Sequence, residues 1–246
     1  MAHETAGGTG SARDMTDWRA DAFARMDEEP DVRFYDAPRF VQHIDEGAIA
    51  AVTETIRQHV PPGADVLDLM SSWVSHLPAP AELPLGRVAG LGMNAEELKR
   101  NHRLIEWAVQ DLNVDPRLPY ADASFGAVLI TVSIQYLTRP DLVLRDVTRA
   151  LIPGGVLIVS FSNRMFPTKA VRVWQETPEE ERPALVAAYL HAAGGFDRPV
   201  VEVHRPRSRW FGGDPLWAVI ARRLEDVGPR SSQEFLLGAP HRRAAS

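Results

Sequence analysis

Five continuous apolar segments, separated by helix-like or loop segments, limit the folds open to this chain more than any other feature. Each is long enough for a buried strand, and they lie at 66–69, 87–93, 107–112, 126–132 and 154–161. Apolar strands that alternate with helices are typical of a parallel sheet covered on both faces, because the crossover between parallel strands is usually a helix. The sequence therefore predicts an α/β fold with a doubly wound sheet, and a ligand site at the carboxyl ends of its strands.

The last third of the chain predicts a different edge for this sheet. A helix over 179–193 leads to a strand at 200–205, a hairpin-like connection at 206–215 and a closing strand at 216–224. Because a hairpin joins antiparallel strands, the closing strand should run against its neighbour. Toward the N-terminus, apolar residues at helical spacing predict one helix over 15–26 and another over 47–60.

Composition argues against several kinds of function. The chain has 27 basic and 33 acidic side chains, a net charge of −6, and its basic residues are scattered, which argues against nucleic acid as a partner. It has no cysteine, so disulfides, thiolate metal sites and cysteine nucleophiles are excluded, and no metal site is predicted. The polar first 14 residues lack the apolar part of a signal peptide, and no later run reaches the length of a membrane span. We expect a cytoplasmic protein, a monomer or homodimer, that acts on a small molecule and has no membrane partner.

The segment from 118 to 164 contains motifs whose order and spacing are hard to meet by chance. It reads LPYADASFGAVLITV at 118–132 and LIPGGVLIVSFSNR at 151–164. In these two motifs the chain resembles the S-adenosylmethionine-dependent methyltransferases of type 11. The resemblance extends over about residues 35–224. It implies a Rossmann-like, seven-stranded, mostly parallel sheet with an antiparallel last strand, helices on both faces and an N-terminal helical lid. It also implies S-adenosylmethionine as the cofactor.

This resemblance divides the chain into four expected parts. Residues 1–13 are expected to be a disordered N-terminus, and 14–60 a helical segment and lid. Residues 61–225 are expected to be the cofactor-binding methyltransferase core, followed by a flexible tail at 226–246.

The first strand departs from that family at its carboxyl end. Where such folds continue into Gly-x-Gly, the chain has Met70, Ser71 and Ser72. The cofactor carries no phosphate, so the phosphate-binding reason for glycine is weak, and small residues with hydroxyls and backbone N–H groups suffice for its amino acid part. The resemblance assigns Asp68 to the family's first acidic position, where it would attract the ammonium group. The alternative is that Asp68 and Ser71 only cap a following helix.

The second strand also departs from the family, because Gly92 stands where a carboxylate usually binds the ribose. Asn94 is a candidate for ribose binding through its amide, with Met93 against the adenine, but Asn94 is equally well placed as the N-cap of the next helix. After the third strand, the resemblance assigns Asp111 to the adenine amino group and Leu112 to a backbone contact.

The segment FYDAPRFVQHIDEG, at 34–47, is the predicted lid and supplies candidate catalytic residues. Methyl transfer needs a general base only when the nucleophile arrives protonated. His43 is a candidate base with Asp45 as its partner, while Tyr35 and Arg39 are candidates to close over the ligand. The alternative for His43 is a structural or solvent-facing role, which is commoner for a lone histidine.

Two further loops follow strands at the ligand-bearing edge. The loop after the fourth strand supplies residues expected to face the cofactor and its methyl group, namely Ser133, Gln135 and Tyr136. The loop after the fifth strand supplies residues suited to an anionic or carbonyl-bearing substrate, namely Asn163, Arg164 and Lys169. The alternative for this second loop is a solvated connection to a helix capped near Thr168.

Three functions stay open from the sequence. The leading one is a methyltransferase acting on an oxygen, nitrogen or sulfur nucleophile of a small metabolite. The second is an enzyme of the same fold that uses the sulfonium for a rearrangement or cyclisation. The third is a non-catalytic binding protein, which the missing ribose carboxylate favours.

Overall fold

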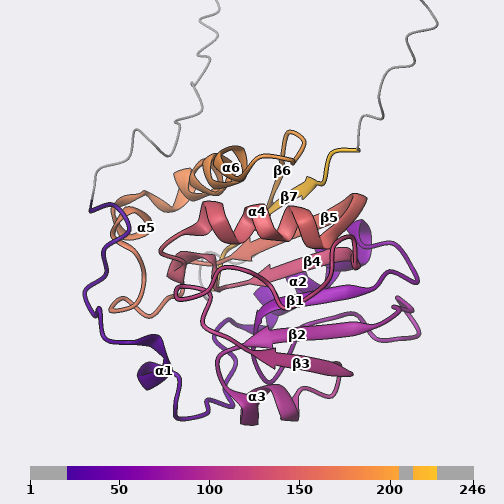
Figure 1. The fold of residues 1–246 in the computed structure, drawn as a ribbon, viewed down its shortest axis with the longest axis horizontal. Helices are drawn as coiled ribbons and strands as arrows, with labels where there is room; N and C mark the ends of the chain where they lie inside the picture. The colour runs from indigo at the N-terminus through magenta and orange to yellow at the C-terminus, as the bar shows by residue number, and fades with distance from the viewer. Residues whose placement is uncertain (1–20, 205–212, 226–246) are drawn as a thin grey trace, which may run out of the picture.

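The computed structural model describes residues 21–204 and 213–225, which form one seven-stranded sheet with flanking helices (Figure 1). The strands in chain order are β1 Val66–Ser71, β2 Val88–Gly92, β3 Glu106–Val109, β4 Phe125–Thr131, β5 Leu151–Phe161, β6 Val200–His204 and β7 Leu216–Arg222. Their order across the sheet is β3-β2-β1-β4-β5-β7-β6. Strands β1 to β5 pair in parallel, while β7 runs antiparallel to both β5 and β6. The predicted mixed sheet with an antiparallel last strand is confirmed.

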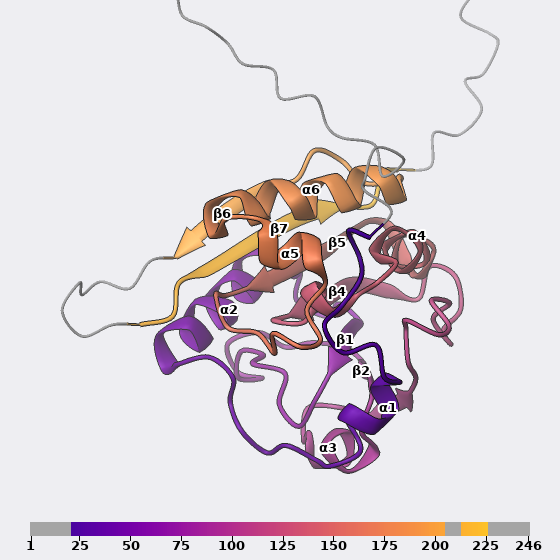
Figure 2. The ribbon, with the colours of Figure 1, turned by 90° about the vertical axis from the view of Figure 1, so that its left-hand side faces the viewer.

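Helices cover both faces of this sheet. The helices of the described residues are α1 Asp31–Phe34, α2 Glu46–His59, α3 Ala95–Arg100, α4 Pro140–Ala150, α5 Arg172–Glu176 and α6 Arg182–Ala193, with 3₁₀ turns at Ile134–Tyr136 and Glu179–Glu181. Figure 2 shows α4 and α6 on one side of the sheet and α2 on the other. In the described residues no helix is both long and apolar enough to cross a membrane.

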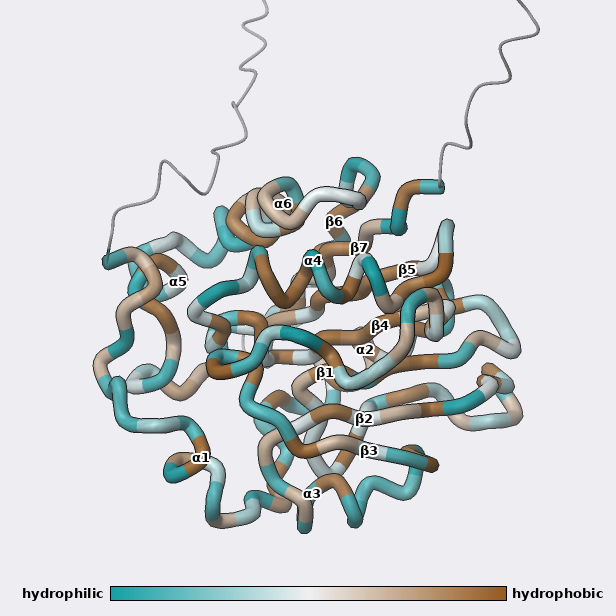
Figure 3. Tube along the Cα trace, viewed as in Figure 1, coloured by the Kyte–Doolittle hydropathy of each residue, from teal (hydrophilic) through white to brown (hydrophobic). Residues whose placement is uncertain are grey.

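Successive side chains of the strands point to alternate faces of the sheet and so form two separate cores. In β4, Val128 and Ile130 pack in the core under α4 and α6, while Ala127 and Leu129 pack in the core under α2. Successive side chains of a strand point to opposite faces, so a continuous apolar strand fills both cores. Figure 3 shows this as hydrophobic colour concentrated along the central strands and hydrophilic colour in the surrounding loops.

The connection from β1 to β2 contains no helix, although the structure describes all of residues 72–87. Pro78, Pro80 and Pro84 interrupt this segment, because proline lacks the backbone donor of a helix and disfavours helical backbone in the residue before it. Leu77 and Leu83 instead bury their side chains in the core under α2. The interpretation that the first turn only caps a helix is therefore wrong.

The N-terminal part of the described chain differs from the predicted helical lid. Residues 21–26, the described end of the helix predicted over 15–26, form a turn and irregular backbone. Residues 21–45, here called the strap, contain only the four-residue α1. The expected disorder at 1–13, most of the connection at 206–215 and the expected tail at 226–246 lie outside the described residues.

Candidate functional site

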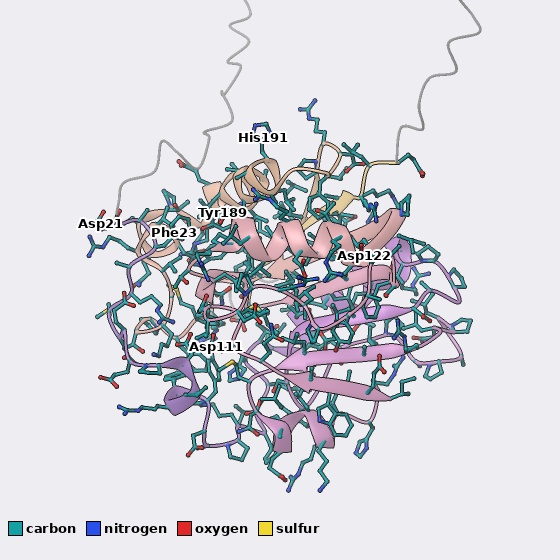
Figure 4. The ribbon with its side chains drawn as sticks, in the orientation of Figure 1. Asp21, Phe23, Asp111, Asp122, Tyr189 and His191 are labelled. Carbon is teal, nitrogen blue, oxygen red and sulfur yellow. The ribbon has the colours of Figure 1, made fainter. Side chains whose placement is uncertain are left out.

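A cavity of about 290 Å³ lies at the carboxyl ends of β1 to β4, between the sheet and the strap. This is close to the lower end of the usual size of ligand pockets. In Figure 1 the indigo strap runs along one end of the sheet, and in Figure 4 Asp111 marks where β3 ends beside the cavity. The edge of the sheet that forms the cavity is the one predicted from the parallel strands.

Most of the predicted site residues meet at this cavity. Every predicted cofactor-binding residue except Asn94 lines it, and so do Arg164 and all four predicted catalytic residues. Their roles stay predictions, but the structure brings together side chains from the strap and from the segments that follow β1 to β5.

Asn94 is the N-cap of α3, so its amide is not available for ribose. Its side-chain oxygen accepts hydrogen bonds from the backbone N–H groups of Glu96 and Glu97, at 2.9 and 3.1 Å. Its side-chain nitrogen donates to the carbonyl oxygens of Tyr35 and Asp36, at 2.8 and 3.0 Å. Both donors and the acceptor of this side chain are thus used to begin a helix and to hold the strap.

Lys169 is also not a substrate-binding residue, because its side chain is buried beneath the strap. It is 1% exposed, and its ammonium lies 3.1 Å from Asp27 and 3.2 Å from Asp31. Asp31 also accepts hydrogen bonds from Arg25 and from Asn113. Lys169 is therefore an anchor that fixes the start of the strap to the core.

Two other predicted substrate-binding residues lie away from the cavity. Gln135 is 1% exposed, and its amide donates to the carbonyl oxygen of Val132 at 2.9 Å. Asn163 is exposed and lies in a second, more open hollow beside Arg164, whose guanidinium pairs with Asp214. The exposed Asn163 fits the alternative of a solvated loop.

His43 lines the cavity without the partner predicted for it. Asp45 is the N-cap of α2, and its two carboxylate oxygens accept from the backbone N–H groups of Ala48 and Asp214, at 2.8 and 2.7 Å. Burial lowers the pKa of the His43 imidazole, and the neighbouring Glu97 carboxylate opposes this in part. The imidazole is therefore neutral at pH 7 and able to accept a proton.

Asp68 brings a buried negative charge to the cavity. It is 3% exposed, its carboxylate accepts a 2.5 Å hydrogen bond from the Ser71 hydroxyl, and Ser75 also donates to it. Burial raises the pKa of Asp68 to about 6, although these hydroxyls act in the opposite direction. No ion pair to Asp68 is found in residues 21–204 and 213–225, so a cationic ligand group would complete its environment.

The backbone is strained around the cavity. Met70, His76 and Val132 all line it and have φ of 59°, 51° and 52°, in the left-handed region that non-glycine residues rarely adopt. For β-branched Val132 this conformation is especially unfavourable. Strain of this kind tends to occur at functional sites, where the surrounding structure holds it.

Two polar atoms of the cavity residues lack protein partners. The Ser133 hydroxyl and one terminal guanidinium nitrogen of Arg39 are buried, and neither makes a hydrogen bond to any residue that the structure describes. Buried polar atoms are normally hydrogen-bonded. These two therefore mark where a polar ligand would bind.

Trp73, His76 and Glu97 are among the cavity residues that the sequence did not predict as site residues. Trp73 and His76 lie in the irregular segment that replaces a helix, and burial lowers the pKa of His76. Glu97 lies in the first turn of α3, where an acidic residue is ordinary. Only the unusual turn after β1 signalled any of these positions.

A comparison with protein families matches residues 74–159 to a methyltransferase domain. This match begins just after the altered turn at the end of β1. The ubiquinone/menaquinone biosynthesis C-methyltransferase UbiE of Rubrivivax gelatinosus is 39% identical over 64 residues, which cover 26% of this chain and 24% of that protein. The chain thus matches about a quarter of the length of this curated relative.

Solved structures share this fold over about three quarters of the chain or more. The 1,6-didemethyltoxoflavin-N1-methyltransferase of Burkholderia thailandensis, with S-adenosylhomocysteine bound, has a TM-score of 0.54 at 20% identity, covering 74% of this chain and 80% of that one. The [4+2]-cyclase SpnF has a TM-score of 0.53 at 16% identity, covering 80% of this chain and 92% of that one. At such low identity these two likenesses establish the fold alone.

The described residues thus share the Rossmann-like fold of the class of S-adenosylmethionine-dependent methyltransferases, and residues 74–159 match a methyltransferase domain. The cofactor of this class is S-adenosylmethionine.

Proposed function

We propose that this chain binds S-adenosylmethionine in the cavity and catalyses methyl transfer to an oxygen, nitrogen or sulfur nucleophile of a small molecule. The observation that carries the proposal is the buried Asp68 carboxylate, which faces the cavity without a cationic partner among the described residues. The cofactor supplies a methyl group on a sulfonium and also carries an ammonium group. A buried carboxylate at the end of the first strand fits that ammonium chemically.

The other cavity residues fit the remaining parts of the cofactor. The free Ser133 hydroxyl can bond to its amino acid end, and Met93 and Leu112 offer apolar surface to a base. One carboxylate oxygen of Asp111 accepts from the backbone N–H of Asn113 at 2.9 Å, which fixes this carboxylate near the cavity. An adenine amino group is a suitable donor for its other oxygen.

Residues of the strap are suited to binding the methyl acceptor and to taking a proton from it. Burial raises the pKa of Tyr35 far above its usual value, so its hydroxyl can donate a hydrogen bond at pH 7 but cannot act as a base. Burial also raises the pKa of Tyr136, whose hydroxyl accepts from the backbone N–H of Phe166 at 2.8 Å. Of the four predicted catalytic residues, neutral His43 is thus the one suited to take a proton, while the free guanidinium nitrogen of Arg39 suits an acceptor with a carbonyl or an anionic group.

The surroundings of Arg39 favour a small, planar acceptor. Its guanidinium lies over the rings of Phe34, Tyr35 and Phe166, at 4.4, 5.7 and 5.5 Å from their centroids. The ring of His43 meets Phe166 edge-on at 5.2 Å. Aromatic side chains arranged in this way suit an aromatic metabolite. We also propose that the protein acts in the cytoplasm, as a monomer or homodimer.

A second candidate function is a rearrangement or cyclisation with the sulfonium unchanged. Its support is that a protein named as a [4+2]-cyclase shares this fold. The two functions differ in the fate of the cofactor, since only methyl transfer converts it to S-adenosylhomocysteine.

The test is incubation of the protein with S-adenosylmethionine, labelled in its methyl group, across a metabolite extract, followed by mass spectrometry. We expect a labelled product together with S-adenosylhomocysteine. Because the curated relative is named as a C-methyltransferase, products methylated on carbon should be sought as well. Conversion of a metabolite without formation of S-adenosylhomocysteine would favour the second function, and no conversion across the extract would contradict both.

A further inference from the structure

The end of β2 has no room for a side chain, which explains the glycine there. The register of β1 shifts between Leu69 and Ser71, so that Ser71 pairs with Gly92. A Cβ atom at residue 92 would overlap the carbonyl oxygen of Ser71. The extended end of β1 therefore excludes a carboxylate at this position, and any acidic group facing this part of the cavity must come from another element.

Glu97, in the first turn of α3, supplies such a group. It is 7% exposed and lines the cavity together with Gly92 and Met93. One carboxylate oxygen accepts from the backbone N–H of Arg39 at 2.6 Å, and the other accepts from the hydroxyl of Ser72 at 2.7 Å. Within the ranges that the structure describes, Glu97 forms no ion pair.

This arrangement leaves acceptor capacity on a carboxylate that is already held in place. A carboxylate has about four lone-pair sites, and two of those on Glu97 are used. Its two donors come from the strap and from the turn after β1, so the carboxylate is fixed before any ligand arrives. A buried charge with only two neutral donors gains from further donors.

The other two buried carboxylates of the cavity, Asp31 and Asp68, already have a partner or a proposed role. Asp31 is neutralised by Arg25 and Lys169. Asp68 lies at the end of β1 and is the group that the proposed function assigns to the ammonium. Glu97 thus remains as the buried acid beside the end of β2.

We propose that Glu97 accepts hydrogen bonds from the adjacent ribose hydroxyls of the cofactor, a role that steric overlap denies to residue 92. The inference rests on the proposed function, because it takes the ligand to be S-adenosylmethionine or its product. Two neighbouring O–H donors match the free lone pairs of one carboxylate. The same carboxylate then joins the ribose, the strap and the turn after β1.

Calorimetric titration tests this role with two ligands and three proteins. The ligands are S-adenosylhomocysteine and its analogue in which hydrogen replaces both ribose hydroxyls. The proteins are the parent chain, Glu97→Gln, and Glu96→Gln as the matched control, since Glu96 is exposed on the same helical turn. Glutamine keeps the size of the side chain but removes its charge and one acceptor.

We expect the dissociation constant of S-adenosylhomocysteine to rise at least tenfold in Glu97→Gln and to be unchanged in Glu96→Gln. The analogue should bind the parent at least tenfold more weakly than S-adenosylhomocysteine, and Glu97→Gln should weaken analogue binding by less than threefold. An equal loss for both ligands would show that Glu97 only holds the strap, and no loss would also overturn the inference.

The parent protein alone keeps the test decisive if Glu97→Gln does not fold. Equal affinity of the parent for the two ligands refutes ribose recognition while leaving the proposed function intact. If the parent binds neither ligand, the proposed function fails along with the inference.

Discussion

Replacing Asp68 by asparagine should separate the stability of the protein from its capacity to bind a cation. Burial raises the pKa of this carboxyl from 3.8 to about 6, so the folded state opposes its ionisation. The ligand-free protein should therefore be most stable, with respect to this group, below pH 4 and lose stability as the pH rises toward 6 and above. The shift corresponds to on the order of 3 kcal/mol at pH 7.

Asp68→Asn removes this cost because asparagine is neutral at every pH. Urea unfolding at pH 7.5 should show a variant more stable than the parent by about 1–3 kcal/mol, the lower value allowing for weakened bonds from Ser71 and Ser75. At pH 4 the difference should nearly vanish. Calorimetry at pH 7.5 should show S-adenosylmethionine binding at least tenfold more weakly, since the ammonium loses its counter-charge.

The exposed Asp36 provides the control, because Asp36→Asn removes a carboxylate outside the cavity. It should change neither stability nor affinity by a comparable amount. An Asp68→Asn variant less stable than the parent at pH 7.5 would refute a cost of ionising Asp68, because it would mean that the fold stabilises the charge. Unchanged cofactor affinity in a folded Asp68→Asn would remove Asp68 from the ammonium site.

Four further variants test the remaining assignments. Asp111→Ala should weaken S-adenosylmethionine binding by about 1–3 kcal/mol, the usual loss for a charge-assisted hydrogen bond, and an unchanged dissociation constant by calorimetry would remove Asp111 from the site. Arg39→Ala or His43→Ala should each lower turnover at least tenfold, about 1.4 kcal/mol of transition-state stabilisation, once an acceptor is known. If both variants have the turnover rate of the parent, the strap has only a packing role. Lys169→Met should destabilise the protein by about 2–4 kcal/mol in urea unfolding, because it leaves Asp27 unpaired and Asp31 with Arg25 as its remaining cation. A loss below about 0.5 kcal/mol would show that this buried pair does not anchor the strap.

The sheet could be predicted because its signal is local. The five apolar runs became β1 to β5, and the predicted edge strands became β6 and β7. The helix predicted over 47–60 became α2, whose N-cap Asp45 is visible in the sequence. Local chemistry decides such elements, so the sequence is enough to find them.

The strap could not be predicted in the same way. Residues 21–26 have helical spacing of apolar side chains, but the strap is held by distant contacts, such as the backbone bond from Asp27 to Thr168 and the ion pair of Asp27 with Lys169. A lysine in a polar loop gives no local sign that it will be buried by a segment about 140 residues away. Asn94 shows the opposite case, because the N-cap alternative already present in the sequence was the correct one.

The most direct test of the account is calorimetric titration of the parent protein with S-adenosylmethionine at neutral pH. This cavity should bind the cofactor although the first turn has no glycine and no helix follows it. We expect one site with a dissociation constant in the micromolar range, about −7 to −8 kcal/mol. Neither heat of binding nor a thermal shift at millimolar ligand would contradict it.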